Sequence, residues 1–440
     1  MNPNHLPQGW EIKKMPDVVK WGSGGTPKAT VREYYENGTI PWLIIGDLND
    51  GIVTESASKI TQAGLENSSA KMIPAGTLLV AMYGSIGKLG ITSIECCTNQ
   101  AIAFAKELHG VTTQYMYYYM MLMKSKLISM GKGGTQKNIS QTVLNSLDVI
   151  VPPTPEQKRI VSQIEESLSQ LDSAVETLKK TKQQLEIYRQ AVLKEAFQGG
   201  YTTAWRNENT DTKSTINDYQ SIEIKTAPFK DISGDENEIN LDLPKEWLYL
   251  RIGEVFDVEV GSTPSRQNNK YWNGNINWVS SGEVRFNHIN STNECITEDG
   301  LKNSSTNLQS IGTVMLAMIG EGKTRGQAAI LDIPAAHNQN TAAILVSRTP
   351  CDPKYIYYFL QLNYNHTRRV GSGNNQKALN KERVRALHFP FATFEEQRII
   401  VDEIECRLSL CEETMKTVDQ SLQQSEALRQ SILKQAFEEE

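Results

Sequence analysis

The sequence holds little that could build a metal site or a disulfide framework. Its 440 residues include six cysteines and six histidines, all scattered along the chain. Neither a C-x-x-C pair nor a histidine at metal-ligand spacing accompanies the cysteines. We therefore predict no metal site and interpret the cysteines as reduced packing residues: Cys96, Cys97, Cys295, Cys351, Cys406 and Cys411.

Long apolar runs are also missing. Apolar runs such as 77–82 and 341–346 are far shorter than the roughly 20 residues of a membrane span. No early segment combines basic residues with a continuous apolar stretch. The sequence thus predicts a soluble, cytoplasmic protein without membrane contact. Its 39% hydrophobic content over this length is enough for two or three cores, so we expect several domains.

A surplus of positive charge is the third missing feature. The formal net charge of −6 argues weakly against a nucleic-acid binder, because such proteins are usually basic. The charge is unevenly distributed, however. Residues 203–242 hold nine acidic and four basic side chains, so the rest of the chain is close to neutral.

An internal repeat organises the chain. The segment Leu6-Pro7-Gln8-Gly9-Trp10 returns as Leu243-Pro244-Lys245-Glu246-Trp247, and further matches follow in the same order at offsets of 236 to 240. They pair Gly24-Gly25-Thr26-Pro27 with Gly261-Ser262-Thr263-Pro264, Ile40-Pro41-Trp42 with Ile276-Asn277-Trp278, Asn99-Gln100 with Asn338-Gln339, Gln136-Lys137 with Gln376-Lys377, and Glu156-Gln157 with Glu396-Gln397. The chain is a tandem duplication.

The first part of each copy has the texture of an α+β domain of about 150 residues. Short β-like runs at 77–82, 102–105, 313–318 and 344–346 alternate with Gly, Asn and Pro. Each copy also has one tyrosine-rich helix, at 115–122 and 355–362. These tyrosines could stack on bases, but their helical spacing and aliphatic neighbours favour core packing.

The second part of each copy is one long helix. Residues 156–197 contain no Gly or Pro, which predicts a rod of roughly 60 Å ended by Gly199. Apolar residues recur in steps of three and four, which is typical of a seam between two packed helices. The alternative is that each helix lies on its own globular neighbour. The predicted seam is Ile164, Leu168, Leu171, Val175, Leu178, Leu185, Ile404, Leu408, Cys411, Met415, Val418 and Leu422.

The ordered series of repeated motifs resembles the specificity subunits of type I restriction-modification systems over essentially the full chain. The second copy departs at the start of its helix, where Phe391-Ala392-Thr393-Phe394 lacks the Pro152-Pro153 pair. The resemblance implies two homologous α/β target recognition domains separated by two long antiparallel, coiled-coil-like helices with pseudo-two-fold symmetry. The implied domains are 1–153 (first recognition domain), 154–199 (central conserved helix), 200–242 (acidic linker), 243–392 (second recognition domain) and 393–440 (distal conserved helix).

The resemblance also implies a function. Each recognition domain would read one half of a bipartite, asymmetric target in double-stranded DNA. The helices would dock two methyltransferase subunits that modify adenine N6, and two restriction/translocase subunits would join them. S-adenosylmethionine, ATP and Mg²⁺ are expected on those partners, and no cofactor is expected in this chain.

Catalytic motifs are absent. Val151-Pro152-Pro153-Thr154 lacks the polar and aromatic neighbours of an adenine methyltransferase motif, and we interpret it as a loop that starts a helix. The stretch Gly320-Glu321-Gly322-Lys323-Thr324 has Ala317 where a phosphate-binding loop needs glycine. We therefore predict a non-catalytic subunit.

Candidate DNA contacts are Lys and Arg for phosphates, and Arg, Lys, Asn or Gln for base edges, on Gly-rich loops. Taken singly, each is an ordinary solvated residue, but the clusters recur at equivalent places in both copies. In the first domain they are Ser23, Thr26, Lys28, Arg32, Lys88, Lys132, Gln136 and Lys137. In the second they are Ser265, Arg266, Lys270, Lys323, Arg325, Arg368, Arg369, Asn374, Asn375, Gln376 and Lys377.

Three other functions stay open at this point. The chain could serve a type II enzyme of the IIB or IIG kind that borrows the same subunit design, or it could be a coiled-coil scaffold that binds proteins. A standalone enzyme with duplicated domains is the third, and the missing motifs disfavour it. A steep salt dependence of DNA binding would separate a phosphate-contacting protein from a scaffold.

Overall fold

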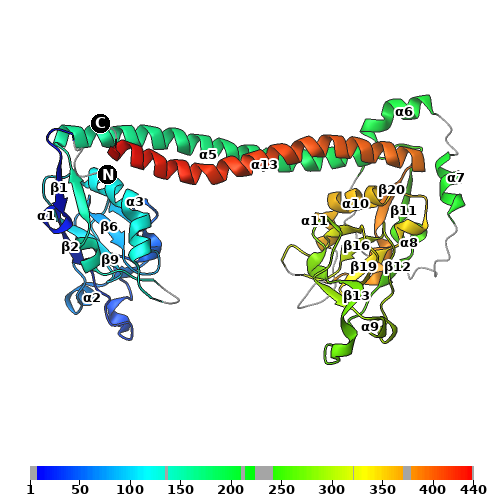
Figure 1. Ribbon diagram of the computed structural model, residues 1–440, viewed down its shortest axis with the longest axis horizontal. Coiled ribbons are helices and arrows are strands. Elements are labelled where there is room, and N and C mark those ends of the chain that lie inside the picture. The colour runs from blue at the N-terminus through cyan, green and yellow to red at the C-terminus, as the bar shows by residue number, and fades with distance from the viewer. Residues whose placement is uncertain are drawn as a thin grey trace. The chain divides into compact units, whose positions relative to one another are not determined.

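The computed structural model describes residues 7–133, 137–209, 214–222, 241–320, 322–369 and 378–438, with the backbone only at residues 214 and 369. It divides into two compact units. Unit 1 combines Met1–Lys180 with Val418–Glu440, and unit 2 is Thr181–Thr417. Each unit therefore contains one copy of the α/β domain together with parts of both long helices (Figure 1).

Unit 1 is built on a five-stranded sheet of order β2-β9-β6-β7-β4, in which only the β4–β7 pair is parallel. A three-stranded sheet of order β5-β3-β8 and a β1–β10 ribbon flank it. The strands are β1 (Glu11–Lys14), β2 (Val19–Ser23), β3 (Ile40–Leu43), β4 (Gly51–Val53), β5 (Lys59–Ile60), β6 (Leu78–Ala81), β7 (Leu89–Thr92), β8 (Cys97–Thr98), β9 (Ile102–Leu108) and β10 (Asp148–Val151).

Unit 2 repeats this topology strand for strand. Its five-stranded sheet has the order β12-β19-β16-β17-β14, with β14–β17 parallel, beside β15-β13-β18 and a β11–β20 ribbon. The strands are β11 (Leu248–Arg251), β12 (Val258–Val260), β13 (Trp272–Val279), β14 (Asn287–Ile289), β15 (Glu294–Ile296), β16 (Val314–Ala317), β17 (Ala328–Leu331), β18 (Ala335–His337), β19 (Thr341–Ile344) and β20 (His388–Phe391). The duplication read from the sequence is thus a duplication of fold.

Short helices connect these strands. Those of unit 1 are α1 (Met15–Val18), α2 (Gln62–Glu66), α3 (Thr113–Met130) and α4 (Gln141–Asn145). Those of unit 2 are α6 (Thr203–Glu208), α7 (Ser214–Ser221), α8 (Ile252–Val255), α9 (Glu298–Lys302), α10 (Pro353–Leu362), α11 (Tyr364–Arg369) and α12 (Lys381–Ala386). The tyrosine-rich helix is α3 in the first copy and α10 in the second. Tyr115, Tyr119 and Tyr355 are buried on these helices, which confirms the core-packing interpretation.

Two long helices complete the fold, α5 (Thr154–Phe197) and α13 (Phe394–Glu438). At ~1.5 Å per residue, the 44 residues of α5 extend about 66 Å. The ion pairs Asp172–Arg429 in unit 1 and Arg189–Glu412 in unit 2 advance along α5 while they retreat along α13, so the helices pack antiparallel (Figure 1). Gly199 ends α5 with a φ of 73°, a left-handed conformation that glycine adopts readily.

The Glu-Gln pair of each copy anchors the start of its helix. The buried Gln157 side chain donates to Pro152 O (2.9 Å) and accepts from the Thr112 backbone N–H (2.9 Å). Gln397 does the same with Ala392 O (2.9 Å) and the Asp352 N–H (3.3 Å). A buried amide with both ends bonded fixes the helix on the preceding strand.

The seam residues lie where the helices contact the domains and each other. Ile164, Leu168, Leu171, Ile404, Leu408, Cys411 and Val418 are buried, and Val175, Leu178, Leu185, Met415 and Leu422 are half-buried. In unit 1, Ile164 and Leu168 share a core cluster with domain residues as well as with Leu433 and Phe437 of α13. The helices therefore pack both on each other and on the globular part, so the two arrangements that are alternatives in the sequence occur together.

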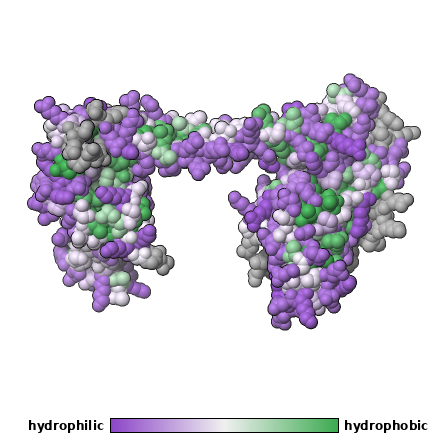
Figure 2. All heavy atoms as spheres, viewed as in Figure 1, coloured by the Kyte–Doolittle hydropathy of each residue, from purple (hydrophilic) through white to green (hydrophobic). Residues whose placement is uncertain are grey.

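The surface drawn in Figure 2 is mostly hydrophilic, as expected when apolar side chains gather in internal clusters. No helix within the described ranges is both long and apolar enough to cross a membrane.

Candidate nucleic-acid interface

The Gly-x-Thr-Pro loop is held in the same way in both domains. Trp42 Nε1 donates to Gly25 O (3.0 Å), and Trp278 Nε1 donates to Ser262 O (3.2 Å). A Cβ at Gly24 would lie 1.8 Å from Thr98 O, so any side chain there would force the loop away from strand β8. The sequence folds this loop against the end of a strand, and only glycine permits the approach.

A threonine–glutamine pair fixes the loop to the next turn. Thr26 donates to Gln100 Oε1, and Thr263 donates to Gln339 Oε1 at 2.6 Å. Both pairs lie at the exposed surface. Gln100 and Gln339 were visible as part of the repeated Asn-Gln pair, but the sequence did not mark them as partners of the loop.

Two further loops join this turn. In unit 1, Met82 N–H donates to Ala101 O (2.8 Å), Ile139 N–H to Met82 O (2.9 Å) and Gly84 N–H to Lys137 O (3.2 Å). In unit 2, the Met318 N–H reaches Asn340 O (2.9 Å) and the Leu379 N–H reaches Met318 O (3.0 Å). We call the result the three-loop face. Its described residues are 23–32, 83–88, 131–133 and 137–138 in unit 1, and 261–270, 319–320, 322–326 and 378 in unit 2. Residues 134–136, 321 and 370–377 lie outside the described ranges.

The predicted contacts of the first domain fall on this face. Ser23, Thr26, Lys28, Arg32, Lys132 and Lys137 are exposed and Lys88 is half-buried, while Gln136 lies outside the described residues. Arg32 is 88% exposed, with Glu36 4.0 Å away. No carboxylate of the described chain pairs with Lys28, Lys132 or Lys137, so these ammonium groups are available to an anionic ligand.

Arg266 in the second domain is held by its own domain. Its guanidinium forms a two-pronged ion pair with Glu294 and stacks 3.8 Å from the ring of Trp272. The hydrogen bond with Glu294 raises the pKa of Arg266, and the same bond lowers the pKa of Glu294. Because the Glu294 carboxylate neutralises its charge, Arg266 should attract phosphates less strongly than Lys270, which is exposed on the same loop.

Arg325 and Arg368 also make internal contacts. Arg325 Nη2 donates to Arg368 O (2.7 Å), and Arg368 Nη1 donates to Tyr364 Oη (3.0 Å). Tyr364 in turn donates to Lys323 O at 2.5 Å, so α11 holds the glycine loop. Lys323 and Ser265 are exposed. Asn374, Asn375, Gln376, Lys377 and the side chain of Arg369 lie outside the described residues.

No group of three or more His, Cys, Asp and Glu side chains that could hold a metal ion occurs in the parts of the chain that the structure describes. The described residues present hydrogen-bonding side chains and ammonium groups on loops held by hydrogen bonds, an arrangement suited to a binding surface.

Comparison with known proteins decides the family. The profile of the type I restriction modification DNA specificity domain matches residues 7–187 and 244–424, one match per copy. The chain belongs to this family. It is a type I specificity subunit, which is a non-catalytic protein, and its function is recognition of a DNA target.

Individual relatives resemble this specificity subunit over most of its length. The MjaIX specificity subunit of Methanocaldococcus jannaschii is 24% identical over 365 residues, covering 81% of this chain and 77% of the relative. The StySPI specificity subunit of Salmonella potsdam is 21% identical, covering 99% of this chain and 90% of its own.

Solved structures share the fold. A chain from a study of complex assembly and conformational transition of the type I R-M system superposes with a TM-score of 0.72 at 15% identity, covering 98% of both chains. The HsdS subunit of Thermoanaerobacter tengcongensis gives a TM-score of 0.55 at 15% identity, covering 100% of this chain and 99% of that one.

Proposed function

We propose that this specificity subunit reads a bipartite, asymmetric site in double-stranded DNA, one half with the three-loop face of each unit. The observation that carries the proposal is that equivalent hydrogen bonds hold the described loops of both units, while the side chains on those loops differ. Lys28 and Arg32 lie on the first loop of unit 1. The first loop of unit 2 carries Lys270 and Arg266, and Arg266 is paired with Glu294. Different side chains on equivalent loop frameworks predict that the two half-sites differ in sequence.

The proposed partners follow from this function. Two methyltransferase subunits would bind the chain and modify adenine N6 in each half-site, and two restriction/translocase subunits would complete the complex. S-adenosylmethionine, ATP and Mg²⁺ would belong to those subunits. The proposed division of labour is 1–153 and 243–392 for target recognition, 154–199 and 393–440 for the conserved helices, and 200–242 for the acidic linker.

Methylation mapping tests the proposal. Single-molecule sequencing of host DNA, with and without this gene, should reveal a split asymmetric motif with one modified adenine per half on opposite strands. A continuous palindrome would contradict the two-domain reading. Binding of the assembled complex to duplex DNA should also weaken steeply with salt, and a flat salt dependence would instead favour the scaffold.

A further inference from the structure

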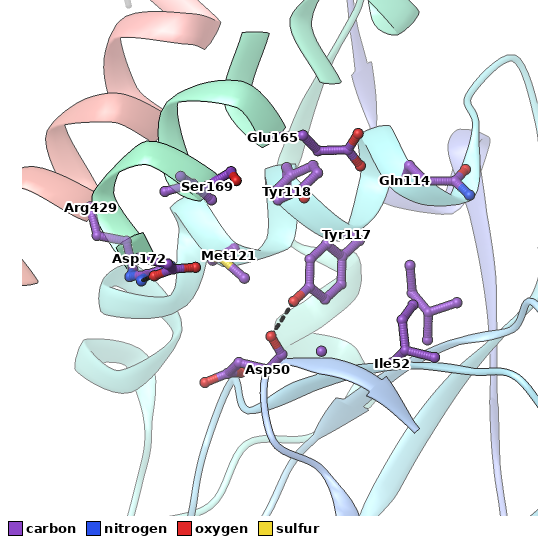
Figure 3. Close-up of a pocket in the computed structure, with 13 residues that line it drawn as sticks. Asp50, Ile52, Gln114, Tyr117, Tyr118, Met121, Glu165, Ser169, Asp172 and Arg429 are labelled. Atoms are coloured by element: carbon purple, nitrogen blue, oxygen red, sulfur yellow. Dashed lines mark hydrogen bonds and ion pairs between the residues drawn. The ribbon is translucent and has the colours of Figure 1, made fainter. Parts of the chain in front are cut away.

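Unit 1 contains a pocket whose lining includes no residue of the three-loop face. It has a volume of about 540 Å³ and opens between strand β4, helix α3 and helix α5 (Figure 3). Ile52, Tyr117 and Tyr118 form apolar and aromatic parts of its lining, with Glu165 and the Asp172–Arg429 pair on the helix side. Ile52 on the edge strand β4 is 56% exposed and so leaves apolar surface open at the pocket.

The charges around this pocket do not balance. Asp50 pairs with Lys124 at 2.7 Å, and Asp172 pairs with Arg429. Glu165 interacts with the Tyr118 hydroxyl, and burial followed by this carboxylate raises the pKa of Tyr118 to about 12. No lysine or arginine among the described residues pairs with Glu165, so one carboxylate beside an aromatic ring is left without a cation.

The second copy shows the same place with the cation present. Glu405 corresponds to Glu165 and Tyr358 to Tyr118, both at an offset of 240. There, Lys354 Nζ lies 2.7 Å from Glu405 Oε1, and the Tyr358 hydroxyl lies 3.4 Å from the same oxygen. The residue of unit 1 that corresponds to Lys354 is Gln114, which lines the pocket but carries no charge.

The wall of this pocket also differs between the two units. At the position of Ile52, unit 2 has His288, whose Nδ1 lies 2.9 Å from an Asp332 carboxylate oxygen and whose ring contacts Tyr357. In unit 2, the carboxylate of Glu405 is therefore paired with a lysine of the same chain. Unit 1 combines an unpaired carboxylate with an open, partly apolar cavity.

We propose that the pocket of unit 1 receives a lysine or arginine side chain from the methyltransferase subunit, in the place that Lys354 fills internally in unit 2. The ammonium or guanidinium group would pair with Glu165 next to Tyr118, where the ring favours a cation. The aliphatic stem would cover Ile52 and Tyr117, since long basic side chains bury their methylenes along apolar surface. The proposal rests on the proposed partnership with methyltransferase subunits.

The sharpest test is the variant Gln114→Lys in the full-length chain, titrated with the methyltransferase subunit of the same system and followed by native mass spectrometry. The new lysine should pair with Glu165 and close the pocket as Lys354 does in unit 2. One of the two methyltransferases should then bind about tenfold more weakly, while the other binds as before. Glu165→Gln should produce the same selective loss.

Glu166→Gln is the matched control, because Glu166 neighbours Glu165 on α5 but does not line the pocket. This variant should bind both methyltransferase subunits as the wild type does. Thermal unfolding of each variant checks that unit 1 stays folded. If the wild type binds two methyltransferases and Gln114→Lys binds both equally well, the pocket proposal is overturned and the proposed function stands. If the folded wild type binds none, both fail.

Discussion

The ring of Phe437, near the end of α13, packs edge-to-face on Tyr115 of α3 with 5.4 Å between centroids. The second copy repeats the relationship, because Phe197 at the end of α5 packs on Tyr355 of α10 at 5.0 Å. Both phenylalanines are fully buried. Each long helix thus begins on the domain that precedes it in sequence and ends in the core of the other unit.

Phe437→Ala should therefore destabilise unit 1. Removing a buried ring leaves a cavity between α13 and α3, which costs about 3 to 5 kcal/mol. Urea unfolding of the full chain should show the loss in the transition that reports on unit 1. Phe437→Leu, which keeps most of the volume, should cost clearly less. Equal stability of the alanine variant and the wild type would mean that the end of α13 does not depend on this core.

A second prediction concerns Glu396, whose carboxylate is 2% exposed. It accepts hydrogen bonds from Arg206 Nη1 (2.5 Å), Thr202 Oγ1 (2.6 Å) and Trp247 Nε1 (2.8 Å). Glu396→Ala would leave the guanidinium of Arg206, itself only 12% exposed, without its carboxylate partner, at a cost of roughly 3 to 5 kcal/mol.

The first copy supplies the matched control for Glu396. Its counterpart Glu156 pairs with Arg159 near the surface, where both side chains are at least 30% exposed. Glu156→Ala should cost under about 1 kcal/mol. Thermal unfolding measures both variants, and similar losses for the two would refute the distinction between a buried and an exposed pair.

The contrast between Glu156 and Glu396 separates features that can be predicted from the sequence from features that cannot. Glu156-Gln157 and Glu396-Gln397 are identical as letters, and both mark the start of a long helix. The partner Arg206 follows the end of α5, 190 residues before Glu396 in the chain, and nothing in local spacing points to it. The repeat, the helix lengths and the strand positions follow from periodic patterns, which are local. Long-range side-chain pairing is not.

The same limit applies to the candidate DNA contacts. Residue type and loop position correctly suggested exposed cations such as Lys28 and Lys132. They could not reveal that Glu294 neutralises Arg266, since these residues meet only when β15 lies beside the loop. The pairing of Thr26 with Gln100 was hidden for the same reason, although both residues stood in repeated motifs.

Acid should destabilise unit 2 through His337. This side chain is 1% exposed, its Nδ1 lies 2.8 Å from Thr341 Oγ1, and its Nε2 has no hydrogen-bond partner among the described residues. Burial lowers the pKa of His337 from 6.5 to about 4, against the opposing charge of Glu259. The unfolded chain therefore binds a proton more readily than the folded one, and stability falls as pH drops from about 6.5 towards 4.

Between pH 7 and pH 5 this histidine should account for a loss of about 2 kcal/mol of unfolding free energy. The test is urea unfolding at both pH values for the wild type and for His337→Thr, since the first copy has Thr98 at this position. The variant should lose less stability than the wild type on acidification. If the wild type and the variant lost the same free energy of unfolding between pH 7 and pH 5, His337 would not titrate in this range.

Lys132 and Lys137 should act as phosphate contacts. Each is exposed on the three-loop face and pairs with no carboxylate of the described chain. Changing either to alanine should weaken DNA binding by the assembled complex about equally for all sequences, and should reduce the slope of log K against log salt by about one. A changed methylation motif with an unchanged slope would instead identify that lysine as a base reader.

The last prediction concerns the long helices. α5 is continuous from Thr154 to Phe197, with Ile164 in the core of unit 1 and Phe197 in that of unit 2, and α13 pairs with it antiparallel. Inserting seven residues after Lys180 and seven after Thr417 would keep the apolar seam in phase, because seven residues make nearly two turns. The insertions would lengthen both rods by about 10 Å, or roughly three base-pair steps of 3.4 Å.

The mapped methylation motif of this double-insertion variant should keep both half-sites and widen the gap between them. A seven-residue insertion in α5 alone serves as the control, because it shifts the seam of one helix against the other and should impair assembly of the complex. If the double-insertion variant assembled and methylated the original motif with its original gap, the helices would not set the spacing. The gap would then have to be set by the partner subunits, since no other continuous element among the described residues runs from one core to the other.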